Sequence, residues 1–345
     1  MLFSRASNAV LARARTMYGK RISDKNYDEL VSCRSIPDVA SYLKKKTSYG
    51  EVLKDVNENN VHRVDIEERL RLKLLMDFEI LGRYDISVGE HFCEYLITRI
   101  EIEQFMHSLM LISASKPNED VFSLPEFFYD HTKVDMRALS RSSSYEEILK
   151  AVKKSPYYGI LLPFKPKENT IANFTGIETA LHNYLYKVVF KTVNTYVKGK
   201  AKKELISFFK LYIDLVNLVR IVRMRKFYKL SEDYMLSSLI DGGSLTKNDL
   251  RPFIQIPDTK QMMANMKKTP MGRKWFSRNL DVVDKVPRNM RFNWGRHNIR
   301  FSVSPPIVLI SYIFLTETEI FNLITIIEGV KYKLSPEEIK KMLIR

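Results

Sequence analysis

Side chains that commonly carry catalysis or bind metals are scattered in this 345-residue sequence. The nearest approach to a metal pair is His91 with Cys93, and a structural zinc site needs about four ligands. We interpret these two as packing residues. The sequence contains no G-x-x-x-x-G-K-[ST] nucleotide-binding loop, no H-E-x-x-H metal motif and no G-x-S-x-G nucleophile turn. We therefore predict no catalytic residue, no metal site and no cofactor, and we expect that the chain is not an enzyme.

Two polar pairs interrupt long apolar segments in the second half of the chain. Asp214 precedes Asn217 by three residues, and Glu319 precedes Asn322 by the same spacing. Residues three apart lie on one face of a helix, so each pair presents an acid and an amide together. We interpret the pairs as residues that join neighbouring helices by hydrogen bonds. The alternative is a functional carboxylate, either an acid of raised pKa or an ion carrier. However, neither a membrane-spanning segment nor a catalytic partner lies near these acids in the sequence.

The chain is strongly basic, since 56 Lys and Arg residues against 40 Asp and Glu residues give a net charge of +16. Such a protein is expected to meet an acidic protein, a lipid headgroup surface or a nucleic acid. The densest basic segment comprises Lys198, Lys200, Lys202, Lys203, Arg220, Arg223, Arg225, Lys226 and Lys229. Aromatic residues among these cations have the spacing of a helix core, and no nucleic-acid-binding motif accompanies them. We predict that Arg220, Arg223 and Arg225 are exposed and bind a partner.

Helices are expected throughout, because the chain has only 12 glycines and 13 prolines and shows no sustained strand alternation. Helix starts are predicted at Ser144, Thr175 and Ser335, each followed three residues later by a glutamate that completes a capping box. The sequence thus predicts an all-α fold.

The longest uncharged segment, 301–316, is too short and too interrupted by proline to span a bilayer, so we predict a buried core helix. Cys33 and Cys93 cannot form a disulfide framework, which indicates a reduced, cytosolic protein. The segment that precedes Asp24 is basic and contains no acid, which imitates a mitochondrial presequence. We prefer an ordinary first helix, because a weak internal repeat includes this segment.

Three segments of the chain resemble one another at intervals of about 110 residues. Each contains a short amphipathic helix, Lys-Lys, then Ser or Thr, and a turn with glycine: 35–53, 144–162 and 258–276. A second match relates the two polar pairs, because each is followed by Tyr-Lys-Leu-Ser, ending at Ser231 and Ser335. A weaker copy runs from residue 8 to 23. We therefore expect three units whose length equals this interval.

The segments IDLVNLVRIVRMRKFYKLSEDYMLSSLIDGG and PPIVLISYIFLTETEIFNLITIIEGVKYKLSPEEIKKMLI, together with the repeated unit, resemble the connector subunit of rotary V-type and A-type ATPases. Members of this family are known as the C subunit in prokaryotes and the d subunit in eukaryotes. The resemblance covers nearly the whole chain and is most specific at its C-terminal end. It implies an all-α funnel of three similar helical repeats with pseudo-threefold symmetry. The repeats would occupy 1–95, 96–205 and 206–345 and form one compact unit.

The same resemblance implies a non-catalytic connector in the central stalk, which couples the rotating shaft to the membrane proteolipid rotor ring for ion transport. Its partners would be the shaft subunits and the ring, with no nucleic acid and no small-molecule substrate. The chain would be a peripheral protein on the cytoplasmic face of a membrane. Two alternatives are a basic all-helical nucleic-acid-binding protein and a helical enzyme whose acid and base meet only in the fold. Neither alternative explains the threefold repeat.

Overall fold

The computed structural model describes residues 2–57, 61–82, 89–114, 126–167, 172–228, 230–269, 273–274 and 280–345. Every regular element within these ranges is a helix, which confirms the all-α prediction. The contacts divide the chain into two compact units. Unit 1 comprises Met1–Cys93, Ser123–Phe128 and Arg291–Arg345, and unit 2 comprises Glu94–Phe122 and Tyr129–Met290. Unit 1 thus joins the two ends of the chain, and the three repeat boundaries stay a prediction.

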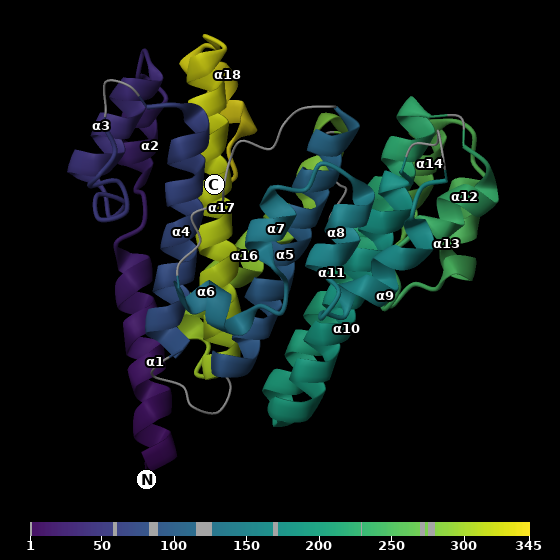
Figure 1. The fold of residues 1–345 in the computed structure, drawn as a ribbon, viewed down its shortest axis with the longest axis horizontal. Coiled ribbons are helices and arrows are strands. Elements are labelled where there is room, and N and C mark those ends of the chain that lie inside the picture. The colour runs from purple at the N-terminus through teal and green to yellow at the C-terminus, as the bar shows by residue number, and fades with distance from the viewer. Residues whose placement is uncertain are drawn as a thin grey trace. The chain divides into compact units, whose positions relative to one another are not determined.

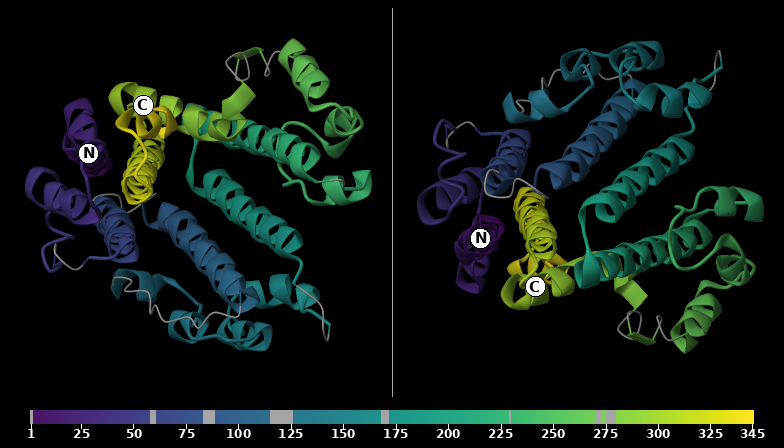
Figure 2. Two further views of the ribbon diagram at one scale, coloured as in Figure 1. Left: turned by 90° about the horizontal axis from the view of Figure 1, so that it is seen from above. Right: turned by 90° about the horizontal axis from the view of Figure 1, so that it is seen from below.

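Unit 1 is built around one long helix, α17 (Pro305–Lys331), which contacts helices from both ends of the chain (Figures 1 and 2). The other helices of the unit are α1 (Leu2–Gly19), α2 (Asp24–Leu30), α3 (Ile36–Lys46), α4 (Arg63–Gly82), most of α16 (Val286–Phe301) and α18 (Pro336–Met342). Helices α1, α3, α4 and α18 all pack on α17. Neighbours on several sides explain why α17 is apolar almost all round.

The apolar segment at the start of α17 is a core element of unit 1. Among the described helices, α17 is the one whose length and composition would allow it to cross a membrane, yet 78% of its apolar window is buried inside the protein. Its core cluster contains Val10, Leu11, Ala14, Leu81, Ile299, Val308, Leu309, Tyr312 and Leu315. Three of these residues belong to α1, so the basic first segment packs as a helix of unit 1.

Unit 2 contains two further long helices, α10 (Phe174–Tyr196) and α11 (Gly199–Phe227), which pack against each other (Figure 1). Its other elements are most of α5 (Gly89–Ser113), part of α6 (Glu126–His131), α7 (Met136–Ser140), α8 (Tyr145–Ala151), α9 (Tyr157–Leu161), η2 (Leu162–Phe164), α12 (Glu232–Ser237), α13 (Lys247–Ile254), α14 (Thr259–Lys268), η3 (Leu280–Lys285) and the start of α16. Helices α13 and α14 contact α11, and α9 contacts α10. Aromatic rings fill the core beside α9, where Tyr157 stacks edge-on with Phe105 at 4.7 Å and with Tyr184 at 5.3 Å.

The predicted helix starts at Ser144 and Ser335 are correct, because each serine hydroxyl accepts a hydrogen bond from the third backbone N–H of its helix. The start predicted at Thr175 is wrong. Helix α10 begins at Phe174, and the side chain of Asn173 accepts from the Gly176 N–H at 2.9 Å. An asparagine two residues earlier caps the helix as well as a threonine would, so the chain adopts the earlier start.

Candidate functional site

Asn217 and Asn322 make the same pair of hydrogen bonds in the two units. The Asn217 amide donates to the Ile240 carbonyl and accepts from the Ile240 N–H, both at 2.8 Å. The Asn322 amide donates to the Ile344 carbonyl at 2.8 Å and accepts from its N–H at 2.9 Å. Both asparagines are buried. Each amide therefore satisfies both polar groups of one buried backbone residue and ties the segment after a short helix to the long helix.

The acid of each pair binds a different set of donors. Asp214 is fully buried and accepts from the backbone N–H groups of Ser244 at 3.1 Å and Leu245 at 3.0 Å. Burial raises the pKa of this carboxyl. Gly243 packs directly on it, and a Cβ there would overlap the Asp214 carboxylate. The absence of a side chain at this glycine thus lets the turn approach the acid closely.

Glu319 binds the N-terminal part of unit 1 to α17. Its carboxylate accepts from the Ile22 N–H at 2.8 Å and from the Tyr49 hydroxyl at 2.8 Å. Burial raises the pKa of Glu319, and burial together with the neighbouring carboxylate raises the pKa of the Tyr49 hydroxyl. This acid therefore acts as a packing residue that holds the segments around α2 and α3 on the central helix.

A third acid and amide pair, which sequence reasoning missed, lies on α5 of unit 2. Glu101 and Gln104 have the same spacing as the other pairs, and both are buried. The Glu101 carboxylate accepts from the Tyr157 hydroxyl at 2.6 Å and from Thr132 at 2.5 Å. Burial raises the pKa of Glu101. The signal that could have found this pair is its position, because the three acids follow one another at the interval of the repeated turns.

Two of these acids accept from the same position of the repeated turn. Tyr49 and Tyr157 each stand two residues after the Thr or Ser that follows Lys-Lys, and both tyrosines are buried. The third turn has Met271 at this place, outside the described residues, and methionine has no hydroxyl to donate. Asp214 receives backbone N–H groups instead.

The three arginines predicted to bind a partner have different surroundings on α11. Contrary to the prediction, the Arg220 side chain is not exposed. Its guanidinium donates to Glu178 at 2.9 Å, to Thr179 at 3.1 Å and to the Ser238 carbonyl at 2.9 Å. Arg225 is partly buried and donates to the Ile254 carbonyl. Arg223 is exposed and lies 3.7 Å from the exposed Asp284.

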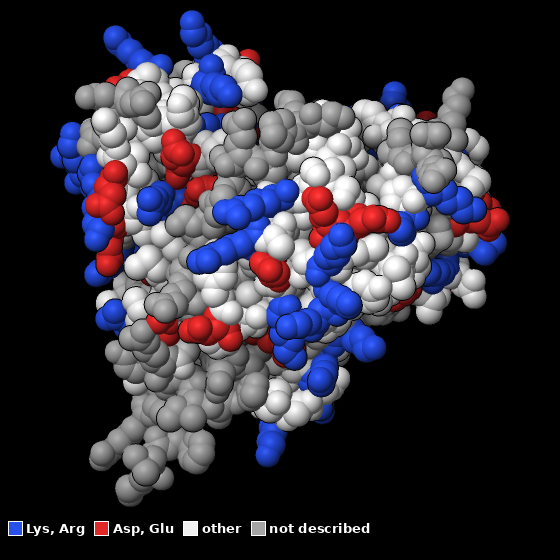
Figure 3. Space-filling view, viewed as in Figure 1, with Lys and Arg blue, Asp and Glu red and all other residues white. Residues whose placement is uncertain are grey.

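Basic side chains occur across the face of the molecule drawn in Figure 3, where they are interspersed with acidic ones. Several basic side chains adjoin one another in the lower centre of that view.

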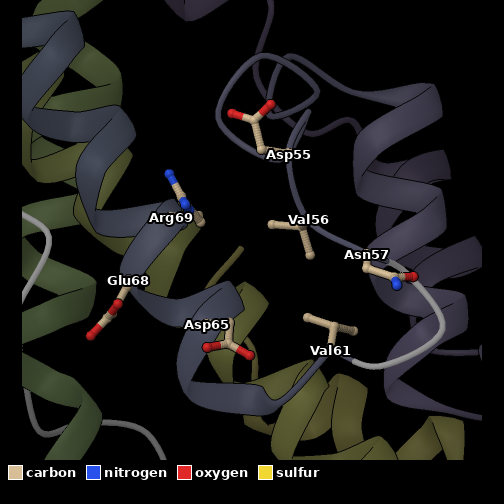
Figure 4. A pocket seen from close by; sticks show the side chains of 7 residues that line it. All are labelled: Asp55, Val56, Asn57, Val61, Asp65, Glu68 and Arg69. Carbon is tan, nitrogen blue, oxygen red and sulfur yellow. The ribbon is translucent and has the colours of Figure 1, made fainter.

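The described residues offer no metal or catalytic centre. No group of three or more described His, Cys, Asp or Glu side chains could hold a metal ion. The side chains of His91 and Cys93 lie outside the described residues. A hollow in unit 1 brings together side chains from α4 and the loop before it (Figure 4), namely Asp55, Val56, Asn57, Val61, Asp65, Glu68 and Arg69. Asp65 accepts from the His62 N–H at 3.0 Å at the start of α4, and the set contains no Ser, Thr, Cys, His or Lys.

Comparison of the sequence with known proteins identifies the family of the chain. Residues 10–342 match the family model described as ATP synthase (C/AC39) subunit. The A-type ATP synthase C subunit of Thermococcus kodakarensis is 24% identical over 347 residues, covering 96% of this chain and 88% of the relative. The C subunits of the A-type ATP synthases of Pyrococcus abyssi and Methanosphaera stadtmanae are 22% and 23% identical, covering 96% of this chain and 88% and 86% of their own lengths. The chain therefore belongs to the ATP synthase (C/AC39) subunit family, which confirms the resemblance seen in its sequence, and it is a non-catalytic subunit rather than an enzyme.

Proposed function

We propose that the chain is the connector in the central stalk of a rotary ATPase of the V/A type. It couples the rotating shaft to the membrane proteolipid rotor ring, so that ATP hydrolysis and ion transport drive each other. It is attached to the cytoplasmic face of the membrane as a peripheral protein. The family match along residues 10–342 is the observation that carries this proposal.

The pseudo-threefold funnel is part of the same proposal. Three long helices, α5, α11 and α17, each carry an acid followed three residues later by an amide, at intervals of about 110 residues. The repeated Lys-Lys turns follow the same interval. These features support three related units, an arrangement in which one repeated fold could surround the axis of a rotating shaft.

The charge of the chain supports acidic partners within the assembly. A net charge of +16 favours association with acidic proteins or anionic membrane surfaces. Binding of nucleic acid is the alternative, and it would show a steep fall of affinity with salt.

Affinity capture from detergent-solubilised membranes tests the proposal. The tagged full chain is recovered in moderate salt, with and without nuclease, and bound proteins are identified by mass spectrometry. We expect a small hydrophobic proteolipid and the shaft subunits, whether or not nuclease is present. Recovery of nucleic acid without these subunits, or of no partner, would overturn the proposal.

A further inference from the structure

The turn between α16 and α17 presents two large apolar side chains to solvent. Phe301 is 69% exposed and Val303 is 83% exposed. Arg15 of α1 fixes the backbone of the turn, since its guanidinium donates to the Ile299 carbonyl at 2.9 Å and to the Ser302 carbonyl at 2.7 Å. The exposure is therefore a property of a fixed turn, which holds two nearby apolar side chains in solvent.

The two chain segments that form and support this turn are basic. Residues 285–316 contain no Asp or Glu, and neither does the segment before Asp24, which supplies α1. Arg296 and Arg300 project from the last turns of α16 and are exposed. They line a groove of unit 1 together with the cations Arg21 and Arg345 and the acids Asp24 and Glu319. Within the described part of the chain neither Arg296 nor Arg300 has a carboxylate partner, and Arg296 lies 5.4 Å from the centre of the Phe292 ring. These cations are available to an anion.

We propose that the α16–α17 turn and the adjacent arginines bind the surface of an anionic phospholipid bilayer. Phe301 and Val303 enter the interfacial layer, while Arg300 and Arg296 contact headgroup phosphates. Apolar side chains at a membrane surface and cations at anionic lipids contribute separately to such binding, so both are needed for firm attachment. A soluble anion would use the arginines but would leave the exposed Phe301 and Val303 without a role.

The opposite end of α17 provides a contrast within the same unit. Tyr332 is 67% exposed and Leu334 is 38% exposed, so this end is apolar too. It stands about 40 Å from the turn, because α17 has 27 residues and each adds about 1.5 Å. Acids and cations alternate around this end, since Glu328, Glu337 and Glu338 lie close in sequence to Lys331, Lys333, Lys340 and Lys341, whereas 285–316 contains no acid. The acids reduce the attraction of this end to an anionic bilayer.

This proposal adds a lipid surface to the protein partners of the proposed connector. Its evidence is the α16–α17 turn and the adjacent arginines, and it does not depend on the connector role. Binding of the purified chain to vesicles requires no other ATPase subunit. A chain that binds no vesicles would therefore leave the capture of shaft and ring subunits untouched, and the reverse holds as well.

Co-sedimentation of the full-length chain with vesicles tests the proposal. Vesicles of phosphatidylcholine alone are compared with vesicles containing about one quarter phosphatidylserine. We expect binding to the anionic vesicles, a loss of about fivefold in the partition coefficient for each of Arg296→Gln and Arg300→Gln, and a loss of roughly tenfold or more for Phe301→Ser with Val303→Ser. The matched control, Tyr332→Ser with Leu334→Ser, is expected to bind as the wild type does.

A second measurement places the turn in the membrane directly. Val303→Trp should gain fluorescence that brominated phosphatidylserine quenches, whereas Tyr332→Trp should gain fluorescence that it does not quench. Equal binding to neutral and anionic vesicles, unchanged binding of the Phe301 and Val303 variant, or equal quenching at both positions would each overturn the proposal.

Discussion

Replacing Asn322 by alanine should destabilise the protein more than most single substitutions. The change removes both hydrogen bonds to Ile344 and a third one, at 3.3 Å, to the Tyr27 hydroxyl. It leaves the N–H and the carbonyl of Ile344 without partners, and Ile344 is only 2% exposed. Each buried group that loses its partner costs about 1–3 kcal/mol, so the free energy of unfolding should fall by about 2–5 kcal/mol. Asn217→Ala should cost a similar amount in unit 2, because Ile240 is only 3% exposed.

Asn183 provides the matched control on α10. Its amide accepts from the Asp241 N–H at 2.9 Å and donates to the Asp241 carboxylate at 3.1 Å, but these bonds are exposed to solvent. Water replaces the lost partner there, so Asn183→Ala should cost less than about 1 kcal/mol. Urea unfolding followed by circular dichroism, with the slope compared between variants, measures all three values. If Asn322→Ala cost no more than Asn183→Ala, the role assigned to the buried amides would be wrong.

Three further predictions concern the acids, the turn tyrosines and the basic helix. Burial raises the pKa of Glu319, so its ionisation opposes folding; the stability of Glu319→Gln relative to wild type should rise as pH increases from about 4 to 8, and a difference independent of pH in urea titrations would contradict this. Tyr49→Phe and Tyr157→Phe each remove a buried hydroxyl bond to a carboxylate, of 2.8 and 2.6 Å, and should each lower the unfolding free energy by about 1.5–3 kcal/mol in urea; values near zero would show that the repeated turn is not held by its tyrosine. Arg223→Glu should change the free energy of unfolding by less than about 1 kcal/mol, because the ion pair of Arg223 is exposed. It should nevertheless reduce the recovery of partner subunits and the salt concentration at which they stay bound, whereas the control Arg251→Glu should leave both unchanged. Equal recovery with both variants would refute docking through Arg223.

The helical character of the chain could be predicted from its sequence because it depends on local signals. These signals are the scarcity of glycine and proline and the serines at helix starts, and each affects the backbone within one turn of helix. The cap at Asn173 shows the limit of such signals, since two neighbouring residues could both begin the same helix and only the backbone decides between them. Element boundaries are therefore harder to predict than element types.

The polar pairs were visible in the sequence, but their bonding partners were not. Spacing alone places Asp214 beside Asn217, whereas the contacts with Ile240 and Leu245 depend on how the chain returns to α11. The pair of Glu101 and Gln104 was overlooked because a glutamine replaces the asparagine. Charge was equally misleading for Arg220, since a cation at a helix surface becomes a packing residue once a carboxylate and a carbonyl face it.

The number of copies of this chain in an intact assembly tests the connector role most directly. If the three units of one chain surround the axis of the shaft, as proposed, a single copy fills the place between the shaft and the ring. Native mass spectrometry of the complex captured through the tagged chain should show one copy together with shaft subunits and many copies of the proteolipid. Two or more copies per complex, or an assembly that contains this chain but neither shaft nor ring, would contradict the connector role.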